Sequence, residues 1–254
     1  MEKTIISQKW KVQTLRLTGF PTDIVKQPEQ EQWWFALTGE YPANRLQNPR
    51  QATLQEDGPF KSGNLIVKIE PLRVDCLYTI DAKAQVESDE IPAIGSFEDA
   101  IKDFSSIVSQ LLQLSSFPLL RRLAFGSILI EPVSNRKEGY DRLAKFLTFP
   151  IDSENSSDFF YQINRPRLSD LITPKISINR LSKWSVAGLE IVALQIKPDL
   201  KAFPPTNLRY AVRLEVDINT SQEFEGSLDK EKRIILFQQL LDYGVEISEK
   251  GDVQ

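Results

Sequence analysis

The most regular pattern in the chain is the alternation of apolar and polar residues from 208 to 219. The apolar positions are Leu208, Tyr210, Val212, Leu214, Val216 and Ile218, and the polar ones between them include Arg209, Arg213, Glu215, Asp217 and Asn219. A period of two places alternate side chains on opposite faces of a β-strand. The pattern predicts a strand with one buried and one solvated face, as in an antiparallel sheet covered on a single side.

Shorter apolar or alternating segments predict the other strands. They lie at 10–20, with a bulge after Val12, and at 32–41, 65–70, 73–78, 123–130, 159–164, 175–186 and 189–196. The segments on either side of Pro71 predict an antiparallel hairpin. From Pro42 to Phe60 the chain is polar and carries turn residues, which is typical of a long surface loop.

Helical spacing of apolar residues marks two long helices. The first covers about 97–116, with Ser96 as its N-cap, and the second covers about 229–250, with Ser227 or Asp229 as cap and Gly251 as the C-terminal stop. A shorter helix is predicted over 136–147.

The order of these elements lacks the strict strand–helix alternation of a parallel fold. We therefore expect an α+β protein with antiparallel sheets, each covered by a long amphipathic helix. The element order leaves open whether the chain consists of two similar halves. The acidic segment 81–95 resembles a linker. We expect one sheet-plus-helix unit over 1–117 and a second, with more than one helix, over 118–254; a single compact unit is the alternative.

The composition restricts the chemistry. The 254 residues include no histidine and one cysteine, Cys76, and the formal net charge is −4. A Ser-His-Asp site, a histidine metal site and a cysteine-ligated zinc site are excluded. None of the glycines forms a phosphate-binding loop pattern. We assign no catalytic residue and expect no cofactor.

The single thiol fits a cytoplasmic setting, and no apolar run is long enough to span a bilayer. We expect no membrane partner.

Three carboxylates are candidates for a metal site. Glu215 and Asp217 project from the polar face of the best strand, and Asp75 could join them. Oxygen ligands of this kind suit Mg²⁺ or Ca²⁺. A solvated face on which Arg209 and Arg213 pair with the two acids explains the same spacing, and we favour that interpretation.

A short repeat, Ile163-Asn164-Arg165 and Ile178-Asn179-Arg180, suggests a basic patch. If the two segments are neighbours, the patch has aromatic faces for bases and cations for phosphates, and it consists of Tyr161, Arg165, Arg167, Arg180, Lys183 and Trp184. The favoured interpretation is that the asparagines bind turn backbone and the arginines pair with Asp158 and Asp170.

The segment Trp33-Trp34-Phe35 and the nearby Tyr41 offer a candidate protein-binding surface. Consecutive residues of a strand face opposite sides, so one tryptophan would be exposed unless another layer covers it. Exposed aromatic residues often mark protein contacts. Burial of both tryptophans in the core is the alternative that we favour.

Three passages together resemble a sporadically distributed bacterial family of uncharacterised proteins. They are the hairpin from Gly58-Pro59-Phe60 to Arg73-Val74-Asp75, the segment 178–186, and Asp217-Ile218-Asn219-Thr220 with the last helix and Gly251-Asp252. The element order, sheet strands followed by a long terminal helix, is similar to SecB-type chaperone folds. That resemblance implies protein binding, and some related proteins accompany toxin–antitoxin or phage-defence genes.

The leading hypothesis is a non-enzymatic cytoplasmic protein that binds another protein, as a SecB-like chaperone or as an accessory subunit of a bacterial immunity system. A nucleic-acid-binding subunit that uses the basic patch is the alternative, and a carboxylate-metal hydrolase is the second alternative. The sequence leaves open whether the chain forms a homo-oligomer.

Overall fold

A computed structural model describes residues 10–25, 33–81, 90–191 and 207–252. Its strands are β1 (Lys11–Pro21), β2 (Asn44–Asn48), β3 (Thr53–Phe60), β4 (Gly63–Glu70), β5 (Arg73–Thr79), β6 (Gly95–Ser96), β7 (Leu120–Val133), β8 (Phe160–Asn164), β9 (Arg167–Ser169), β10 (Ile176–Ile191) and β11 (Asn207–Thr220). The helices are α1 (Trp33–Thr38), α2 (Phe97–Gln113), α3 (Arg136–Leu143) and α4 (Lys230–Lys250).

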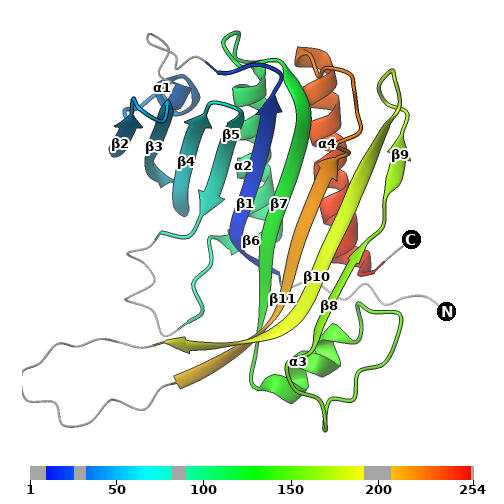
Figure 1. Cartoon of the computed structure of the whole chain (residues 1–254). Coiled ribbons are helices and arrows are strands. Elements are labelled where there is room, and N and C mark those ends of the chain that lie inside the picture. The colour runs from blue at the N-terminus through cyan, green and yellow to red at the C-terminus, as the bar shows by residue number, and fades with distance from the viewer. Residues whose placement is uncertain (1–9, 26–32, 82–89, 192–206, 253–254) are drawn as a thin grey trace, which may run out of the picture.

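All of these strands belong to one antiparallel sheet (Figure 1). The order is β2-β3-β4-β5-β1-β7-β11-β10-β8, with β6 beside β1 and β9 beside β10. The expectation of separate sheets, each covered by one long helix in an α+β layout, is wrong, because β1 pairs with β7 from Lys11 to Pro21 and joins the two parts of the chain into a single eleven-stranded sheet. Such pairing joins strands about 100 residues apart, and the pattern of one strand does not specify its neighbour.

The predicted boundary between residues 117 and 118 falls between α2 and β7. The strand that follows this boundary pairs with β1 of the first segment and with β11 of the second. The two segments therefore share backbone hydrogen bonds along the middle of the sheet.

The helices of the described chain lie on one face of the sheet, and α2 and α4 are seen behind it in Figure 1. Phe104 of α2 and Phe237 of α4 are buried, with their ring centroids 6.4 Å apart, and Phe104 also contacts Phe125 of β7. The predicted N-caps Ser96 and Asp229 are both confirmed. The Asp229 carboxylate accepts a hydrogen bond from the backbone N–H of Lys232 at 3.0 Å.

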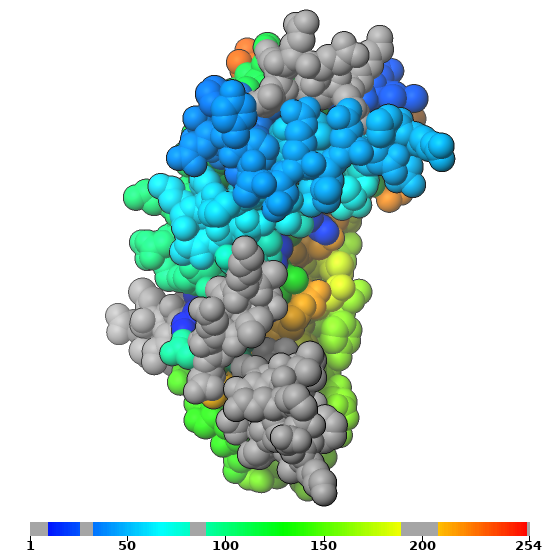
Figure 2. All heavy atoms as spheres, turned by 90° about the vertical axis from the view of Figure 1, so that its left-hand side faces the viewer, coloured from blue at the N-terminus to red at the C-terminus, as the bar shows by residue number. Residues whose placement is uncertain are grey.

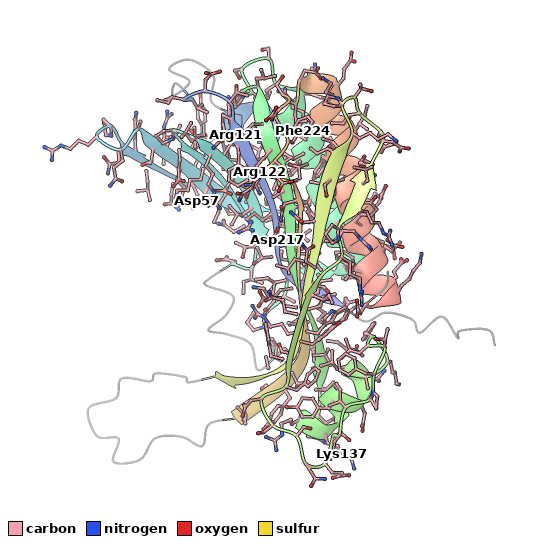
Figure 3. All side chains as sticks on the ribbon, turned by 45° about the vertical axis from the view of Figure 1, so that its right-hand side comes forward. Asp57, Arg121, Arg122, Lys137, Asp217 and Phe224 are labelled. Atoms are coloured by element: carbon pink, nitrogen blue, oxygen red, sulfur yellow. The ribbon has the colours of Figure 1, made fainter. Side chains whose placement is uncertain are left out.

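The opposite face of the sheet, which we call the open face, carries no helix in the described ranges. Its polar row includes Asp217 and Arg122, which Figure 3 shows projecting from the middle of the sheet. Seen from the side, β2 to β5 overhang a recess in which β10 and β11 are exposed (Figure 2). The predicted one-sided burial of β11 is confirmed, since Leu214 and Ile218 are buried while Glu215 and Asp217 are partly exposed.

Several local predictions are confirmed. The bulge in β1 lies between Val12 and Thr14, and β4 and β5 form the expected hairpin. The strands at 123–130 and 159–164 and the helices after Ser96, Asn135 and Asp229 also appear.

Three local predictions are wrong. Residues 33–38 form α1 and not a strand, and the supposed loop from Pro42 to Phe60 contains β2 and β3. The segments 175–186 and 189–196 were expected to be separate strands, but β10 runs without interruption from Ile176 to Ile191, and residues 192–196 lie outside the described residues. Most of the predicted linker, residues 82–89, also lies outside them.

No helix in the described part of the chain is long and apolar enough to cross a membrane.

Candidate functional site

The short helix α1 positions the aromatic residues singled out in the sequence. Trp33 and Trp34 are buried, at 1% and 2% exposure. Trp33 stacks on Phe117, with ring centroids 5.5 Å apart, and its indole N–H donates to Ser116 Oγ at 3.0 Å. The helix ends at Thr38, and Gly39 follows with a positive φ of 76°, which suits a C-terminal stop.

Trp34 packs closely against β3. A Cβ atom at Gly58 would lie 3.1 Å from the Trp34 ring, so the absence of a side chain at Gly58 lets the indole approach the strand. The Trp34 backbone N–H donates to the buried carboxylate of Glu56 at 3.4 Å, and Arg45 lies 3.6 Å from the same carboxylate. The Trp34 indole nitrogen is buried and has no hydrogen-bond partner among the described residues.

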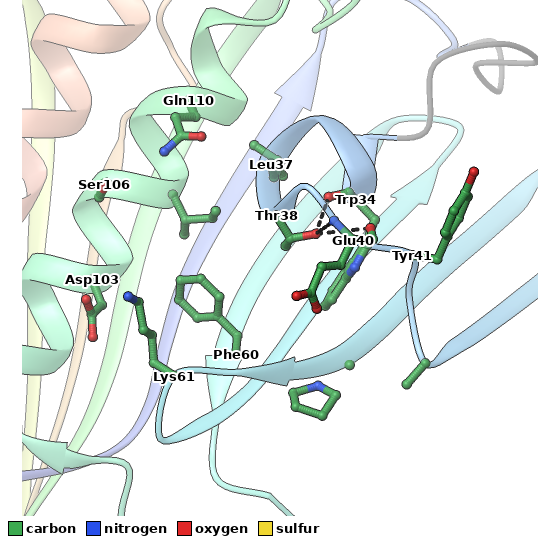
Figure 4. A pocket seen from close by; sticks show the side chains of 14 residues that line it. Trp34, Leu37, Thr38, Glu40, Tyr41, Phe60, Lys61, Asp103, Ser106 and Gln110 are labelled. Carbon is green, nitrogen blue, oxygen red and sulfur yellow. Dashed lines mark hydrogen bonds between the residues drawn. The ribbon is translucent and has the colours of Figure 1, made fainter.

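A hollow of about 530 Å³ opens beside Trp34, between α1, the turn from β3 to β4, and α2 (Figure 4). We call it the α1–α2 hollow. Its apolar lining includes Trp34, Leu37, Phe60 and Ile107. Its polar lining consists of Thr38, Glu40, Lys61, Asp103, Ser106 and Gln110. The hollow therefore combines apolar walls with a few polar groups, which is typical of ligand and peptide sites.

Two exposed aromatic rings lie beside this hollow. Tyr41, which lines it, is 74% exposed, and Phe35 is 45% exposed. Their ring centroids are 5.3 Å apart. The structure thus divides the predicted aromatic surface, because the two tryptophans are in the core while Phe35 and Tyr41 form an exposed pair.

The structure does not bring the three metal candidates together. Asp75 is buried beside Arg73, at 2.7 Å, and accepts a hydrogen bond from Thr18 at 2.6 Å. Its strand, β5, is three strands away from β11 in the sheet order, which corresponds to about 14 Å at the usual strand spacing. No cluster of three or more metal-ligating side chains occurs among the described residues.

The other two carboxylates lie on the open face, in ion pairs. Glu215 is 2.9 Å from Arg213 and 3.8 Å from Lys183, while Asp217 accepts from Asn219 at 2.8 Å and lies 3.9 Å from Arg16. They border a hollow of about 290 Å³, whose lining also includes Leu77, Ile128 and Leu181. The contact of Glu215 with Arg213 is one that the solvated-face interpretation predicts, whereas the contacts with Lys183 and Arg16 were not foreseen.

The two Ile-Asn-Arg segments do meet. Asn164 donates to the Asn179 side chain at 3.0 Å and accepts the backbone N–H of Arg180 at 2.9 Å. The Arg165 backbone N–H in turn donates to the Arg180 carbonyl at 3.2 Å. The asparagines therefore bind one another and the backbone at the junction of β8 and β10.

The arginines of these segments are paired with carboxylates at the C-terminal end of α4. Arg165 binds Asp252 through Nε at 2.5 Å and Nη2 at 2.8 Å, and the Tyr161 hydroxyl donates to the same carboxylate at 2.7 Å. Arg167 and Arg180 both bind Glu246, at 2.7 and 2.8 Å. The arginines do pair with acids, but the predicted partners Asp158 and Asp170 were wrong for these contacts.

Burial divides the remaining members of the predicted basic patch. The Arg180 side chain is 1% exposed, and burial lowers its pKa. Trp184 is fully buried against Trp10 and Phe146, whereas Lys183 projects to the open face. In this conformation Trp184 is not accessible for stacking on a base.

Burial tends to raise the pKa of Glu246, but the hydrogen bond from Arg167 and the charges of Arg180 and Lys250 lower it below the ordinary value. The hydrogen bond from Arg165 likewise lowers the pKa of Asp252. Both carboxylates are thus held in the charged form beside their arginines.

The sequence interpretation missed α1 and the α1–α2 hollow. A usable signal was present, because Trp33 and Leu37 are four residues apart and Gly39 follows as a helix stop. The aromatic residues outweighed this signal, since they also favour strands.

Comparisons with protein-family models, with curated proteins and with solved structures gave no match. The resemblance to a sporadically distributed bacterial family and to SecB-type folds stays a prediction.

Proposed function

We propose that this chain is a protein-binding factor that holds a segment of another polypeptide at the α1–α2 hollow. The observation that carries the proposal is the exposed Phe35–Tyr41 pair beside a hollow with apolar walls. Exposed aromatic residues next to a pocket are typical anchors of protein interfaces.

The lining of the hollow suits a peptide. Leu37, Phe60 and Ile107 offer an apolar surface for a side chain, and Gln110 and Ser106 offer groups for peptide N–H and C=O. Lys61 carries the positive charge of the lining, while Glu40 and Asp103 carry two negative charges (Figure 4), so the lining has a net charge of −1.

A binding role is favoured over an enzymatic one for two reasons. The chain has no histidine, and the candidate carboxylates Asp75, Glu215 and Asp217 are engaged by basic or amide side chains. The internal ion pairs of Arg165, Arg167 and Arg180 likewise favour protein binding over nucleic-acid binding, which stays an alternative prediction.

A cytoplasmic location is part of the proposal and is supported by the single, buried thiol of Cys76. The more specific roles, a SecB-like chaperone or an accessory subunit of a toxin–antitoxin or phage-defence system, rest on the resemblance alone.

The proposal is tested by selecting peptides from a phage-displayed random library on the immobilised full chain. Affinity for a fluorescent copy of a selected peptide is then measured by anisotropy. We expect the double substitution Phe35→Ala and Tyr41→Ala to weaken binding by about tenfold or more, because truncated anchors typically cost over about 1 kcal/mol each.

Phe160→Ala is the matched control, since Phe160 is a similarly exposed aromatic residue, at 60%, in β8. Its substitution should leave the affinity unchanged. Failure to select any peptide, or equal binding by the double variant and the wild type, would contradict the proposal.

A further inference from the structure

The strand β2 forms an open edge of the sheet. It pairs with β3 on one side, and no element of the described chain lies beyond it on the other. All five of its residues are exposed. An edge strand of this kind presents unpaired backbone N–H and C=O groups to another strand.

The edge has few of the features that normally prevent pairing with another chain. Proteins protect such edges with proline or with charged side chains, especially lysine. No proline occurs between Asn44 and Asn48, and the single charged residue is Arg45. Arg45 lies 3.6 Å from the buried Glu56, so its charge is engaged within the chain.

The sequence of β2, Asn44-Arg45-Leu46-Gln47-Asn48, is complementary to itself when it is reversed. In an antiparallel pair centred on Leu46, Leu46 lies opposite Leu46, Asn44 opposite Asn48, and Arg45 opposite Gln47. Asn44 Nδ2 donates to Asp57 and Asn48 Oδ1 accepts from the backbone of Arg50 and Gln51. The Asn48 amide nitrogen and the Asn44 amide oxygen are the groups that can bind each other in the outer pairs. This register places no like charges directly opposite one another, an arrangement that would be destabilising.

The backbone allows the same register. Residues that face each other in an antiparallel pair must both point their N–H and C=O groups toward the partner, or both away from it. A twofold axis through one residue meets this condition, because that residue faces its own copy.

The side chain at the centre of this register has apolar surface to bury. Leu46 is 64% exposed and borders a hollow of about 190 Å³, together with Thr53, Leu54, Gln55 and Lys68. Opposite residues of an antiparallel pair project to the same face of the sheet, with Cβ atoms about 5 Å apart. The Leu46 of a second copy would therefore cover the first and adjoin this hollow.

We propose that β2 pairs antiparallel with β2 of a second copy of this chain, centred on Leu46, and joins two eleven-stranded sheets into one. Five residues from each chain form a small contact, so the dimer is reversible and concentration-dependent. The interface differs from the α1–α2 hollow, and the proposal does not depend on the proposed function.

The test is sedimentation equilibrium of the full chain from about 1 to 200 µM, the range in which weak complexes with micromolar dissociation constants appear. We expect the wild type to pass from monomer to dimer across this range. Leu46→Lys should weaken the dimer by about tenfold or more, since it places two like charges opposite each other. Leu168→Lys, at a 66% exposed position of β9, is the matched control and should leave the dimer unchanged.

The register is tested by mixing two variants. Leu46→Lys and Leu46→Glu should each be weaker dimers alone, and an equimolar mixture should recover the dimer, because opposite charges then face each other. Circular dichroism checks that each variant is folded. A wild-type monomer over the whole range, a dimer insensitive to Leu46→Lys, or no recovery in the mixture would overturn the proposal.

Discussion

At the scale of single residues, Asp252 fixes the end of the described chain. Its side chain is 1% exposed and binds Arg165 and Tyr161, while its backbone N–H donates to the Phe146 carbonyl at 2.8 Å. Gly251 precedes it with a φ of 77°, and a Cβ atom there would collide with the Phe146 carbonyl. The carboxylate and the glycine together hold the C-terminal end of α4 against β8.

We expect Asp252→Asn to lower the free energy of unfolding at pH 7 by about 3 kcal/mol, because it leaves the Arg165 guanidinium without its ionic partner. The pKa of Asp252 is lower in the folded state than its ordinary value. Its contribution is therefore complete above about pH 4 and is lost as the pH falls through the lower folded pKa.

The measurement is urea denaturation between pH 8 and pH 3. The difference between wild type and Asp252→Asn should stay constant from pH 8 to 5, where the histidine-free chain has few titrating groups, and shrink below about pH 4. Glu249→Gln, at an exposed position of α4, is the control and should change stability little. A variant as stable as wild type at pH 7 would contradict the role assigned to Asp252.

At the scale of elements, one helix completes the end of another. The last turn of α2 has no basic residue. Arg233 of α4 supplies the missing donors, since its buried guanidinium donates to the carbonyls of Leu112 at 2.7 Å and Pro118 at 3.1 Å. It also lies 4.8 Å from the centre of the Phe117 ring. Carbonyls at the end of a helix need such partners when water is excluded.

Arg233→Met should therefore lower the free energy of unfolding by about 2–4 kcal/mol, because it leaves buried carbonyls without donors. Arg233→Lys keeps the charge but cannot reach several carbonyls at once, so an intermediate loss is expected. Lys232→Met, one residue earlier and more exposed, is the matched control. Urea denaturation followed by circular dichroism gives the three values, and equal losses in the Arg233→Met and Lys232→Met variants would refute the capping role.

At the scale of the whole molecule, one sheet crosses both parts of the chain. Trp33 lies in the part of the chain before residue 118, where its ring stacks on Phe117. Trp184 lies in the later part, yet its ring contacts Trp10, which directly precedes β1. Because β1 and β7 share hydrogen bonds over ten paired positions, neither part can unfold without exposing an edge of the other.

We expect a single cooperative unfolding transition. In a Trp10→Phe/Trp184→Phe variant the fluorescence reports on Trp33 and Trp34, and in a Trp33→Phe/Trp34→Phe variant it reports on Trp10 and Trp184. In each variant, the urea midpoints from fluorescence and from far-ultraviolet circular dichroism should coincide within about 0.2 M. Separate midpoints would instead support two units that divide near residue 118.

Some of this architecture could be predicted because the signal is local. The alternation from 208 to 219, the caps at Ser96 and Asp229, and the stop at Gly251 follow from steric and hydrogen-bonding needs of a few neighbouring residues. The sequence of β2 had no such signal: all five residues are exposed, and Leu46 is the single apolar residue among them, so apolar and polar positions do not alternate. Its pairing with β3 by backbone hydrogen bonds becomes visible only in the folded chain.

The candidate site divides in the same way. The sequence alone determined that Phe35 and Tyr41 were candidates for contact, that histidine chemistry is excluded, and that one face of β11 is polar. The tertiary structure decided that Trp34 lines a hollow beside α2, that Arg180 is buried, and that Arg165 meets Asp252, 87 residues away. The physical reason is that periodicity and caps depend on the nearest few residues, whereas hollows and ion pairs depend on strand order, which brings together side chains distant in sequence.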